Sequence, residues 1–126
     1  MKKLNNKGFS LVELIIVIAI MVILVVVIAP QYTKFVSNSR IAADVQTAQA
    51  LATAIDVAVA NDEKPFTDSG LDFTKISGVT EMPTSKYYSG TAFAVTGDNT
   101  NGVSKITVNS EEVYPNPDAG INTHKK

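Results

Sequence analysis

The chain has 126 residues, no cysteine and a formal net charge of −1, and 45% of its residues are hydrophobic. This length suits one small domain, and without cysteine that domain is not stabilised by disulfides. A near-neutral charge and a single histidine, with no Ser/His/Asp or phosphate-loop pattern, argue against a nucleic-acid-binding protein and an enzyme, and we expect no cofactor or metal.

The N-terminal segment is basic and then strongly apolar. Lys2, Lys3 and Lys7 precede a run from Leu14 to Ala29 that contains no polar residue. As a helix, the 21 residues 9–29 would be about 31 Å long, which is roughly the hydrocarbon thickness of a bilayer. The lysines predict a cytoplasmic N-terminus and place residues 31–126 outside. We therefore expect a single-pass membrane protein, N-in and C-out, as the precursor.

Glu13 lies at the start of this apolar segment. A carboxylate in a spanning helix costs about 2.5 to 3.5 kcal/mol at the bilayer centre, so such a residue usually has a cationic partner and a function. The lysines of the leader are one source of that cation, because their long side chains can extend along the helix.

The motif Gly8-Phe9-Ser10-Leu11-Val12-Glu13 resembles the prepilin cleavage site of type IV pilins and of the related pseudopilins of type II secretion and competence systems. The resemblance covers residues 7–30. It implies that a membrane aspartyl peptidase removes the leader, residues 1–8, between Gly8 and Phe9 and then N-methylates Phe9. It also implies a homo-oligomeric helical filament, with an assembly platform protein and an ATPase as partners.

Cleavage after Gly8 would create a new cation. The α-amino group of Phe9, with a reference pKa of about 7.7 to 8, is mostly protonated at neutral pH and lies at the same membrane depth as Glu13. A neighbouring subunit displaced along the axis would bring its Phe9 amine to Glu13 in a low-dielectric setting. We therefore predict an assembly charge pair between Phe9 and Glu13.

Two other interpretations of the N-terminus remain open. Residues 1–29 could form a secretory signal peptide, although the 16-residue apolar run exceeds the usual 7 to 15 and Val27-Ile28-Ala29 before Pro30 is a poor cleavage site. Alternatively, the segment is a generic membrane anchor.

After the apolar segment, the pattern becomes amphipathic. One predicted helical face carries Ile41, Val45, Ala48, Ala52, Ile55 and Val59, and the other carries Asn38, Arg40, Asp44, Gln46, Gln49, Thr53 and Asp56. The pattern predicts one helix from about Ser10 to Ala60, bent at Pro30 because proline lacks the N–H and its ring crowds the preceding turn. The alternative is a helix that ends at Ala29.

The remaining sequence predicts loops and a small sheet. Residues 61–90 form a loop region with a short helical turn near Asp68 to Ile76, and residues 91–96 and 103–108 form a β-hairpin. A third strand comes from residues 112–114 or from residues 86–88, because two strands alone are marginally stable. Residues 97–102 are interpreted as a hairpin turn, since their spacing does not match a calcium loop. Residues 116–126 are predicted to be an exposed tail.

Together these elements predict an α+β fold, a long N-terminal helix packed on a small antiparallel sheet. The expected segments are the leader (1–8), the membrane or filament-core helix (9–30), the amphipathic helix (31–60) and the loop, sheet and tail region (61–126). The expected function is a major-type subunit of a surface pilus. The alternatives are a pseudopilin and a minor tip pilin that acts as an adhesin. Removal of the three leader lysines lowers the formal charge from −1 to −4, which argues against a nucleic-acid partner.

Overall fold

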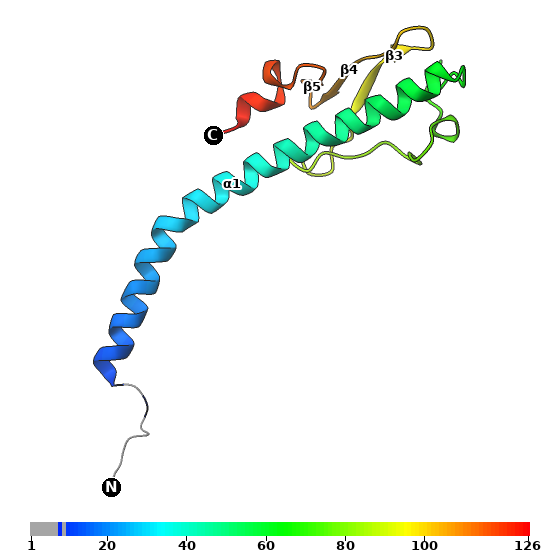
Figure 1. Ribbon diagram of the computed structural model, residues 1–126. Helices are drawn as coiled ribbons and strands as arrows, with labels where there is room; N and C mark the ends of the chain where they lie inside the picture. The colour runs from blue at the N-terminus through cyan, green and yellow to red at the C-terminus, as the bar shows by residue number, and fades with distance from the viewer. Residues whose placement is uncertain (1–7, 9) are drawn as a thin grey trace. The chain divides into compact units, whose positions relative to one another are not determined.

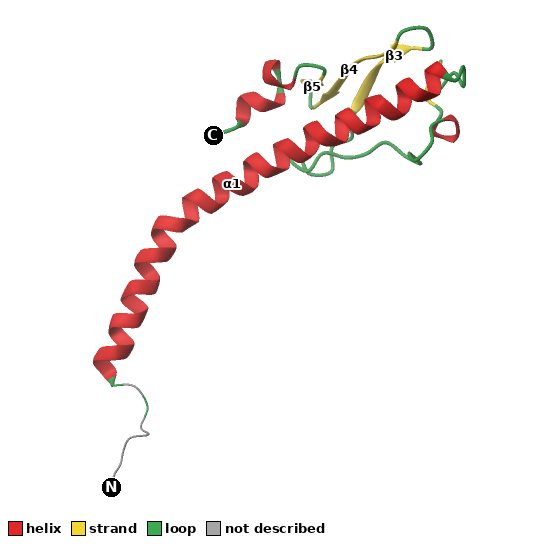
Figure 2. Cartoon of the chain, viewed as in Figure 1, coloured by secondary structure: helices red, strands yellow, loops and turns green. Residues whose placement is uncertain are grey.

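The computed structural model of the protein describes Gly8 and residues 10–126. Helix α1 (Leu11–Ala60) is followed by strands β1 (Phe66–Thr67), β2 (Gly70–Leu71), β3 (Ala94–Asp98), β4 (Gly102–Val108) and β5 (Glu111–Tyr114), shown in Figure 1 and Figure 2. Short 3-10 helices lie at η1 (Phe73–Lys75), η2 (Pro117–Ala119) and η3 (Ile121–His124). The chain divides into two compact units, Met1–Phe35 and Val36–Lys126, which are considered separately below.

Helix α1 continues through Pro30, so the predicted long helix is confirmed and the alternative of a helix ending at Ala29 is wrong. Proline removes one backbone donor from the helix but leaves the bonds of the neighbouring turns. In the next turn, the Thr33 hydroxyl donates to the Ala29 carbonyl at 2.8 Å. The bend at Pro30 stays a prediction. The helix ends where predicted, as Asp62 adopts a positive φ of 61° and the Glu63 N–H donates to the Ala58 carbonyl.

The main sheet is antiparallel, in the order β3-β4-β5, and pairs Val95 with Ile106 and Ile106 with Tyr114. The predicted hairpin is confirmed, but β3 begins at Ala94 because residues 91–93 bond to the preceding loop. There the Phe93 N–H donates to the Pro83 carbonyl, and the Ser85 N–H donates to the Thr91 carbonyl. The predicted third strand at residues 112–114 is confirmed as β5, whereas residues 86–88 form a turn.

The core of the unit 36–126 lies between the second half of α1 and this sheet. Its buried hydrophobic residues are Ile41, Ala48, Leu51, Ala52, Ile55 and Ala58 from α1, together with Ile76, Phe93, Ile106, Val108, Val113 and Ile121. Removing this apolar surface from water stabilises the unit by roughly 25 cal/mol per Å². The predicted α+β fold class, a long helix packed on a small antiparallel sheet, is confirmed.

The apolar face of α1 was predicted correctly at four of its six positions, and Val45 and Val59 are half-buried at its edges. The placement of Asp44 and Asp56 on the solvent face was wrong. Asp44 is only 1% exposed, and Asp56 is half-buried. Both carboxylates are turned inward because they accept backbone N–H groups from segments more than 40 residues away.

The predicted exposed tail at residues 116–126 is also wrong, because this segment folds back onto the unit. Ile121 is fully buried in the core. Gly120 lies so close to the Glu112 backbone that a Cβ at this position would overlap it. Asn38 and Lys126 form two reciprocal hydrogen bonds of 3.0 Å, one in each direction between the amide side chain and the backbone.

The loop region 61–90 contains little regular structure, as predicted. Strands β1 and β2 form a two-stranded sheet that pairs Phe66 with Leu71. The short helical turn expected nearby is η1, and the Asp72 side chain caps it by accepting hydrogen bonds from the Thr74 N–H and hydroxyl. These two bonds, with a smaller contribution from Lys75, hold the pKa of Asp72 below its usual value.

Candidate functional site

The N-terminal end of α1 is closed by Ser10. Its hydroxyl accepts a hydrogen bond of 3.2 Å from the Glu13 backbone N–H, and its carbonyl accepts one of 3.1 Å from the Leu14 N–H. Ser10 and Glu13 therefore have the spacing of a capping box, a sequence signal for the start of a helix. A negative charge in the first turn of a helix also interacts favourably with the helix dipole. Glu13 thus lies in the first turn of α1, and its side chain is exposed.

The predicted processing site lies just before this cap. Gly8 and Ser10 are exposed and outside the helix, which begins at Leu11. Helix α1 therefore starts downstream of the bond between residues 8 and 9. Phe9 itself lies outside the described residues, so cleavage between Gly8 and Phe9, N-methylation of Phe9 and its charge pair with Glu13 stay predictions.

The apolar segment that follows has no partner within its own unit. The large hydrophobic side chains from Leu14 to Ile28 are between 48% and 67% exposed. By length and composition, α1 contains a segment able to cross a membrane, and none of that segment is buried. A helix that is hydrophobic on all sides must be surrounded by lipid or by other protein. These features define a protein with an N-terminal membrane or assembly helix and a folded α+β unit.

Comparison with known proteins defines the N-terminal segment more closely. Residues 3–29 match the family model of the prokaryotic N-terminal methylation motif. The chain is 31% identical, over 77 residues, to the "Prepilin peptidase-dependent protein A" of Clostridium perfringens (strain 13 / Type A). That match covers 60% of this chain and 55% of the relative, so the chain matches about half the length of that protein. No solved structure matches the chain significantly.

The resemblance to prepilins is therefore confirmed: the chain carries an N-terminal methylation motif and is similar to a prepilin peptidase-dependent protein. Pilin-like proteins are not enzymes, which agrees with the prediction of no catalytic function. Among Gly8 and residues 10–126, no group of three or more His, Cys, Asp or Glu side chains is placed to hold a metal ion.

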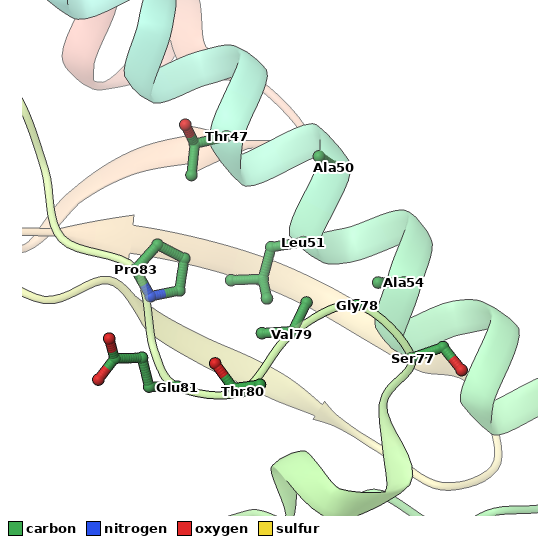
Figure 3. A pocket seen from close by; sticks show the side chains of 10 residues that line it. All are labelled: Thr47, Ala50, Leu51, Ala54, Ser77, Gly78, Val79, Thr80, Glu81 and Pro83. Atoms are coloured by element: carbon green, nitrogen blue, oxygen red, sulfur yellow. The ribbon is translucent and has the colours of Figure 1, made fainter.

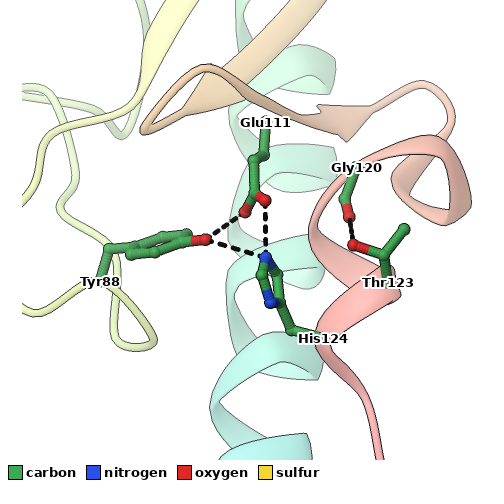
Figure 4. A network of polar contacts seen from close by, with 5 residues as sticks. All are labelled: Tyr88, Glu111, Gly120, Thr123 and His124. Atoms are coloured by element: carbon green, nitrogen blue, oxygen red, sulfur yellow. Dashed lines mark hydrogen bonds and ion pairs between the residues drawn. The ribbon is translucent and has the colours of Figure 1, made fainter.

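A polar cluster in the unit 36–126, which the sequence did not reveal, joins Tyr88, Glu111 and His124 (Figure 4). The Tyr88 hydroxyl donates to the Glu111 carboxylate, whose second oxygen lies 2.6 Å from His124 Nε2. Burial and the neighbouring Glu111 raise the pKa of Tyr88 to about 12. Burial alone would raise the pKa of Glu111, but the hydrogen bonds from Tyr88 and His124 outweigh it and hold that pKa below its usual value.

The cluster joins three segments distant in sequence: the turn at residues 86–90, strand β5 and helix η3. His124 was predicted to lie in an exposed tail, whereas its ring is half-buried and also stacks near Tyr87, with ring centroids 5.4 Å apart. The cluster therefore attaches the C-terminal segment to the rest of the unit, in a chain without disulfides.

The buried Asp44 holds the same turn through a second set of hydrogen bonds. Its carboxylate accepts hydrogen bonds from the Ser85 hydroxyl at 2.5 Å, the Lys86 N–H at 2.7 Å and the Tyr87 N–H at 3.0 Å. The Ser85 hydroxyl in turn accepts a bond of 2.8 Å from the Tyr88 N–H. Both oxygens of the buried Asp44 side chain therefore accept hydrogen bonds, which offset the cost of removing a polar group from water.

The loop at residues 97–102 has the turn chemistry predicted for it. Asp98 accepts hydrogen bonds from the Thr100 and Asn101 N–H groups, and these bonds lower its pKa. The Asn99 amide side chain bonds both backbone groups of Phe66, at 2.9 and 2.7 Å. The carboxylate and amide oxygens are thus used to hold the hairpin and to attach it to β1.

A groove of about 450 Å³ lies between α1 and the loop at residues 77–83 (Figure 3). Its lining residues are Thr47, Ala50, Leu51, Ala54, Ser77, Gly78, Val79, Thr80, Glu81 and Pro83. Glu81 is the one charged residue of the lining, and it has no second titratable group beside it in the groove. The groove therefore offers no arrangement for acid–base or metal chemistry.

Proposed function

We propose that this protein is a structural subunit of a type IV pilus-like filament, matured by cleavage between Gly8 and Phe9 and by N-methylation of Phe9. The observation that carries the proposal is the wholly exposed apolar segment from Leu14 to Ile28, which begins directly after a single acidic residue, Glu13. The methylation motif over residues 3–29 and the similarity to a prepilin peptidase-dependent protein support the dependence on a prepilin peptidase.

In the first stage, the membrane holds the precursor. The apolar segment lies in the bilayer, the leader stays in the cytoplasm, and the unit 36–126 lies outside. The peptidase hydrolyses the amide bond between Gly8 and Phe9, which leaves a carboxylate on Gly8 and a protonated amine on Phe9. Because the helix cap at Ser10 lies downstream of this bond, cleavage leaves the hydrogen bonds of the first turn of α1 in place.

In the second stage, the cleaved subunit docks on its neighbours. The exposed Glu13 of one subunit accepts the Phe9 amine of another, and pairing removes the cost of keeping two separate charges in a low-dielectric environment. N-methylation keeps the charge of the amine, so it leaves this interaction available. The pair fixes the axial offset between neighbouring subunits.

In the filament, apolar side chains replace lipid around each segment. Moving from lipid to protein gives no hydrophobic gain by itself, and side-chain packing drives that exchange. Once the filament is outside the membrane, however, each Å² of apolar surface returned to water would cost roughly 25 cal/mol, which keeps the subunits together. Such a filament resists salt and dissociates in detergent.

A repeating subunit is favoured over a tip adhesin by two features. Glu13 supplies the charge pair that each step of a filament requires, and the unit 36–126 has one core and no inserted binding domain. An assembly platform and an ATPase would be the partners of this process. A secretion or competence pseudopilus uses the same N-terminal chemistry and is separated from a pilus by filament length.

The test is intact-mass analysis with N-terminal sequencing of protein sheared from the cell surface. We expect a chain that begins at N-methylated Phe9, within fibres visible by electron microscopy. A chain beginning near Gln31 would indicate signal-peptidase cleavage, and an intact N-terminus confined to membranes would indicate a simple anchor. Either result would overturn the proposal.

A further inference from the structure

The turn of α1 that follows Pro30 carries an exposed aromatic pair, Tyr32 and Phe35, with Lys34 between them. We call these three residues the collar. Tyr32 is 66% exposed and Phe35 69%, among the highest values for any large hydrophobic side chain in the described residues. Their spacing of three places the two rings on the same side of the helix. Both belong to the same unit as the apolar segment, Met1–Phe35.

The position of the collar relative to the apolar segment identifies its environment. A helix rises about 1.5 Å per residue, so Tyr32 and Phe35 lie roughly 4.5 and 9 Å beyond Ala29, the last residue of the apolar run. The hydrocarbon core of a bilayer is about 30 Å thick, and the headgroup layers add roughly 5 to 8 Å on each side. With residues 9–29 spanning the core, Tyr32 and Lys34 fall within the outer headgroup layer and Phe35 lies at its outer edge.

The chemistry of the collar suits that layer. Tyrosine rings gather at membrane interfaces, and lysine extends its ammonium toward headgroup phosphates along an apolar stem. The hydroxyl of the intervening Thr33 is bonded to the Ala29 carbonyl within the helix, so it needs no outside partner. Tyr32 also lines a shallow apolar hollow of about 230 Å³ together with Leu24, Val25, Ile28 and Ala29, a surface that suits the upper part of an acyl chain.

We infer that the collar is a lipid-binding anchor: Tyr32, Lys34 and Phe35 bind the outer headgroup layer and fix the depth at which the unprocessed subunit is held. Helix α1 runs without a break from Leu11 through the collar, so the depth of the collar also sets the depth of Ser10 and Glu13 relative to the inner surface. This inference rests on the membrane-stored stage of the proposed function, and it requires neither cleavage nor filament assembly.

The chain contains no tryptophan, so a single introduced one reports on its own position. We would reconstitute the full-length, uncleaved chain in phosphatidylcholine–phosphatidylglycerol vesicles with quenchers placed either near the headgroup or deep in the acyl chains. Phe35→Trp tests the collar, Ile20→Trp calibrates the middle of the apolar segment, and Val57→Trp is the matched control at an exposed apolar position in the other unit. For Phe35→Trp we expect more quenching by the shallow quencher, for Ile20→Trp more by the deep quencher, and for Val57→Trp none.

A second set of variants tests whether the collar sets the depth of the helix in the bilayer. In the Ile20→Trp background, Tyr32→Ser with Phe35→Ser should shift the ratio of shallow to deep quenching, whereas Val57→Ser should leave it unchanged. An unchanged ratio in the double variant would overturn the inference, as would a Phe35→Trp emission insensitive to both quenchers or quenched mainly by the deep one.

Two further outcomes are also distinguishable. Quenching of Phe35→Trp that vanishes as the protein-to-lipid ratio rises would assign the collar to a second copy of the chain and overturn the lipid assignment. An Ile20→Trp emission insensitive to both quenchers would instead reject membrane insertion, and with it the membrane stage of the proposed function.

Discussion

The Ser85 hydroxyl donates a hydrogen bond of 2.5 Å to the buried carboxylate of Asp44, 41 positions earlier in the chain. This bond connects α1 to the loop that leads into β3, and the same carboxylate accepts the backbone N–H groups of Lys86 and Tyr87. One side chain therefore holds a turn that has no regular secondary structure. The same turn carries Tyr88, whose hydroxyl forms hydrogen bonds with Glu111 and His124.

Asp44→Ala should destabilise the unit 36–126 by roughly 3 kcal/mol, because it leaves two backbone donors and a hydroxyl without an acceptor in a buried site. The free energy of unfolding can be measured on the full chain in mild detergent by urea denaturation, followed by near-ultraviolet circular dichroism. Gln49→Ala, at an exposed position of the same helix, is the control and should change it by less than about 0.5 kcal/mol. Equal effects of the two variants would contradict the role assigned to Asp44.

Glu111 should make the unit sensitive to acid. Its pKa is depressed in the folded state, so the stability it contributes is complete above its unfolded value of 4.5 and is lost as the pH falls through the lower folded value. Glu111→Gln should therefore cost roughly 1 kcal/mol at pH 7, and the difference from the wild type should shrink between about pH 5 and pH 3. Urea denaturation across this pH range checks it, and a constant difference would count against the depressed pKa.

Tyr88 should titrate well above the usual range of a tyrosine, because burial and the carboxylate of Glu111 raise its pKa to about 12. The protonated phenol is favoured by folding, so its contribution is complete below pH 10 and is lost as the pH rises through the folded value. Absorbance at the phenolate band should show a late phase that Tyr88→Phe removes and Tyr32→Phe retains. If the late phase persisted in Tyr88→Phe, it would belong to another tyrosine.

The pattern of apolar and polar residues within single elements was sufficient to predict much of the fold. Apolar spacing predicted the face of α1 from Ile41 to Ile55, and the strand pattern predicted the hairpin at residues 91–96 and 103–108, since each signal lies within one element. Asp44 was misplaced because the donors that make its burial favourable come from residues 85–87, and periodicity carries no information about them. The Tyr88–Glu111–His124 cluster was missed for the same reason.

The folding of the C-terminal segment onto the unit is a second feature that the sequence pattern could not predict. Ile121 is the one large apolar residue in a polar and glycine-containing sequence there, and a single such residue gives no period from which to infer burial. Its docking depends on Gly120, which allows the segment to approach the Glu112 backbone closely. At the N-terminus the outcome was different, because the prepilin-like motif lies in consecutive residues and could be recognised without the fold.

Gly120→Ala should loosen the C-terminal segment. A Cβ at this position would overlap the Glu112 backbone, and such overpacking typically costs about 1 to 3 kcal/mol. We expect faster amide hydrogen exchange in residues 121–124 and reduced protection of β5. Ala119→Ser, at the exposed neighbouring position, should leave exchange unchanged. Wild-type exchange in Gly120→Ala would mean that the segment does not depend on this close approach.

One pair of variants can separate the proposed charge pair of Glu13 from the hydrogen bond of its backbone to the helix cap. Glu13→Gln keeps the backbone bond from Glu13 to the Ser10 hydroxyl but removes the charge, whereas Ser10→Ala keeps the charge and removes the cap, which is worth about 1 kcal/mol. If the charge pair guides assembly, Glu13→Gln should lower the amount of surface filament about tenfold or more, corresponding to a loss of at least 1.4 kcal/mol per docking step. Ser10→Ala should retain most of the filament. Quantitative immunoblotting of the sheared fraction against the membrane fraction measures both. Normal filament in Glu13→Gln would reject the charge pair, and an equal loss in Ser10→Ala would mean that the helix cap is needed for assembly as much as the charge is.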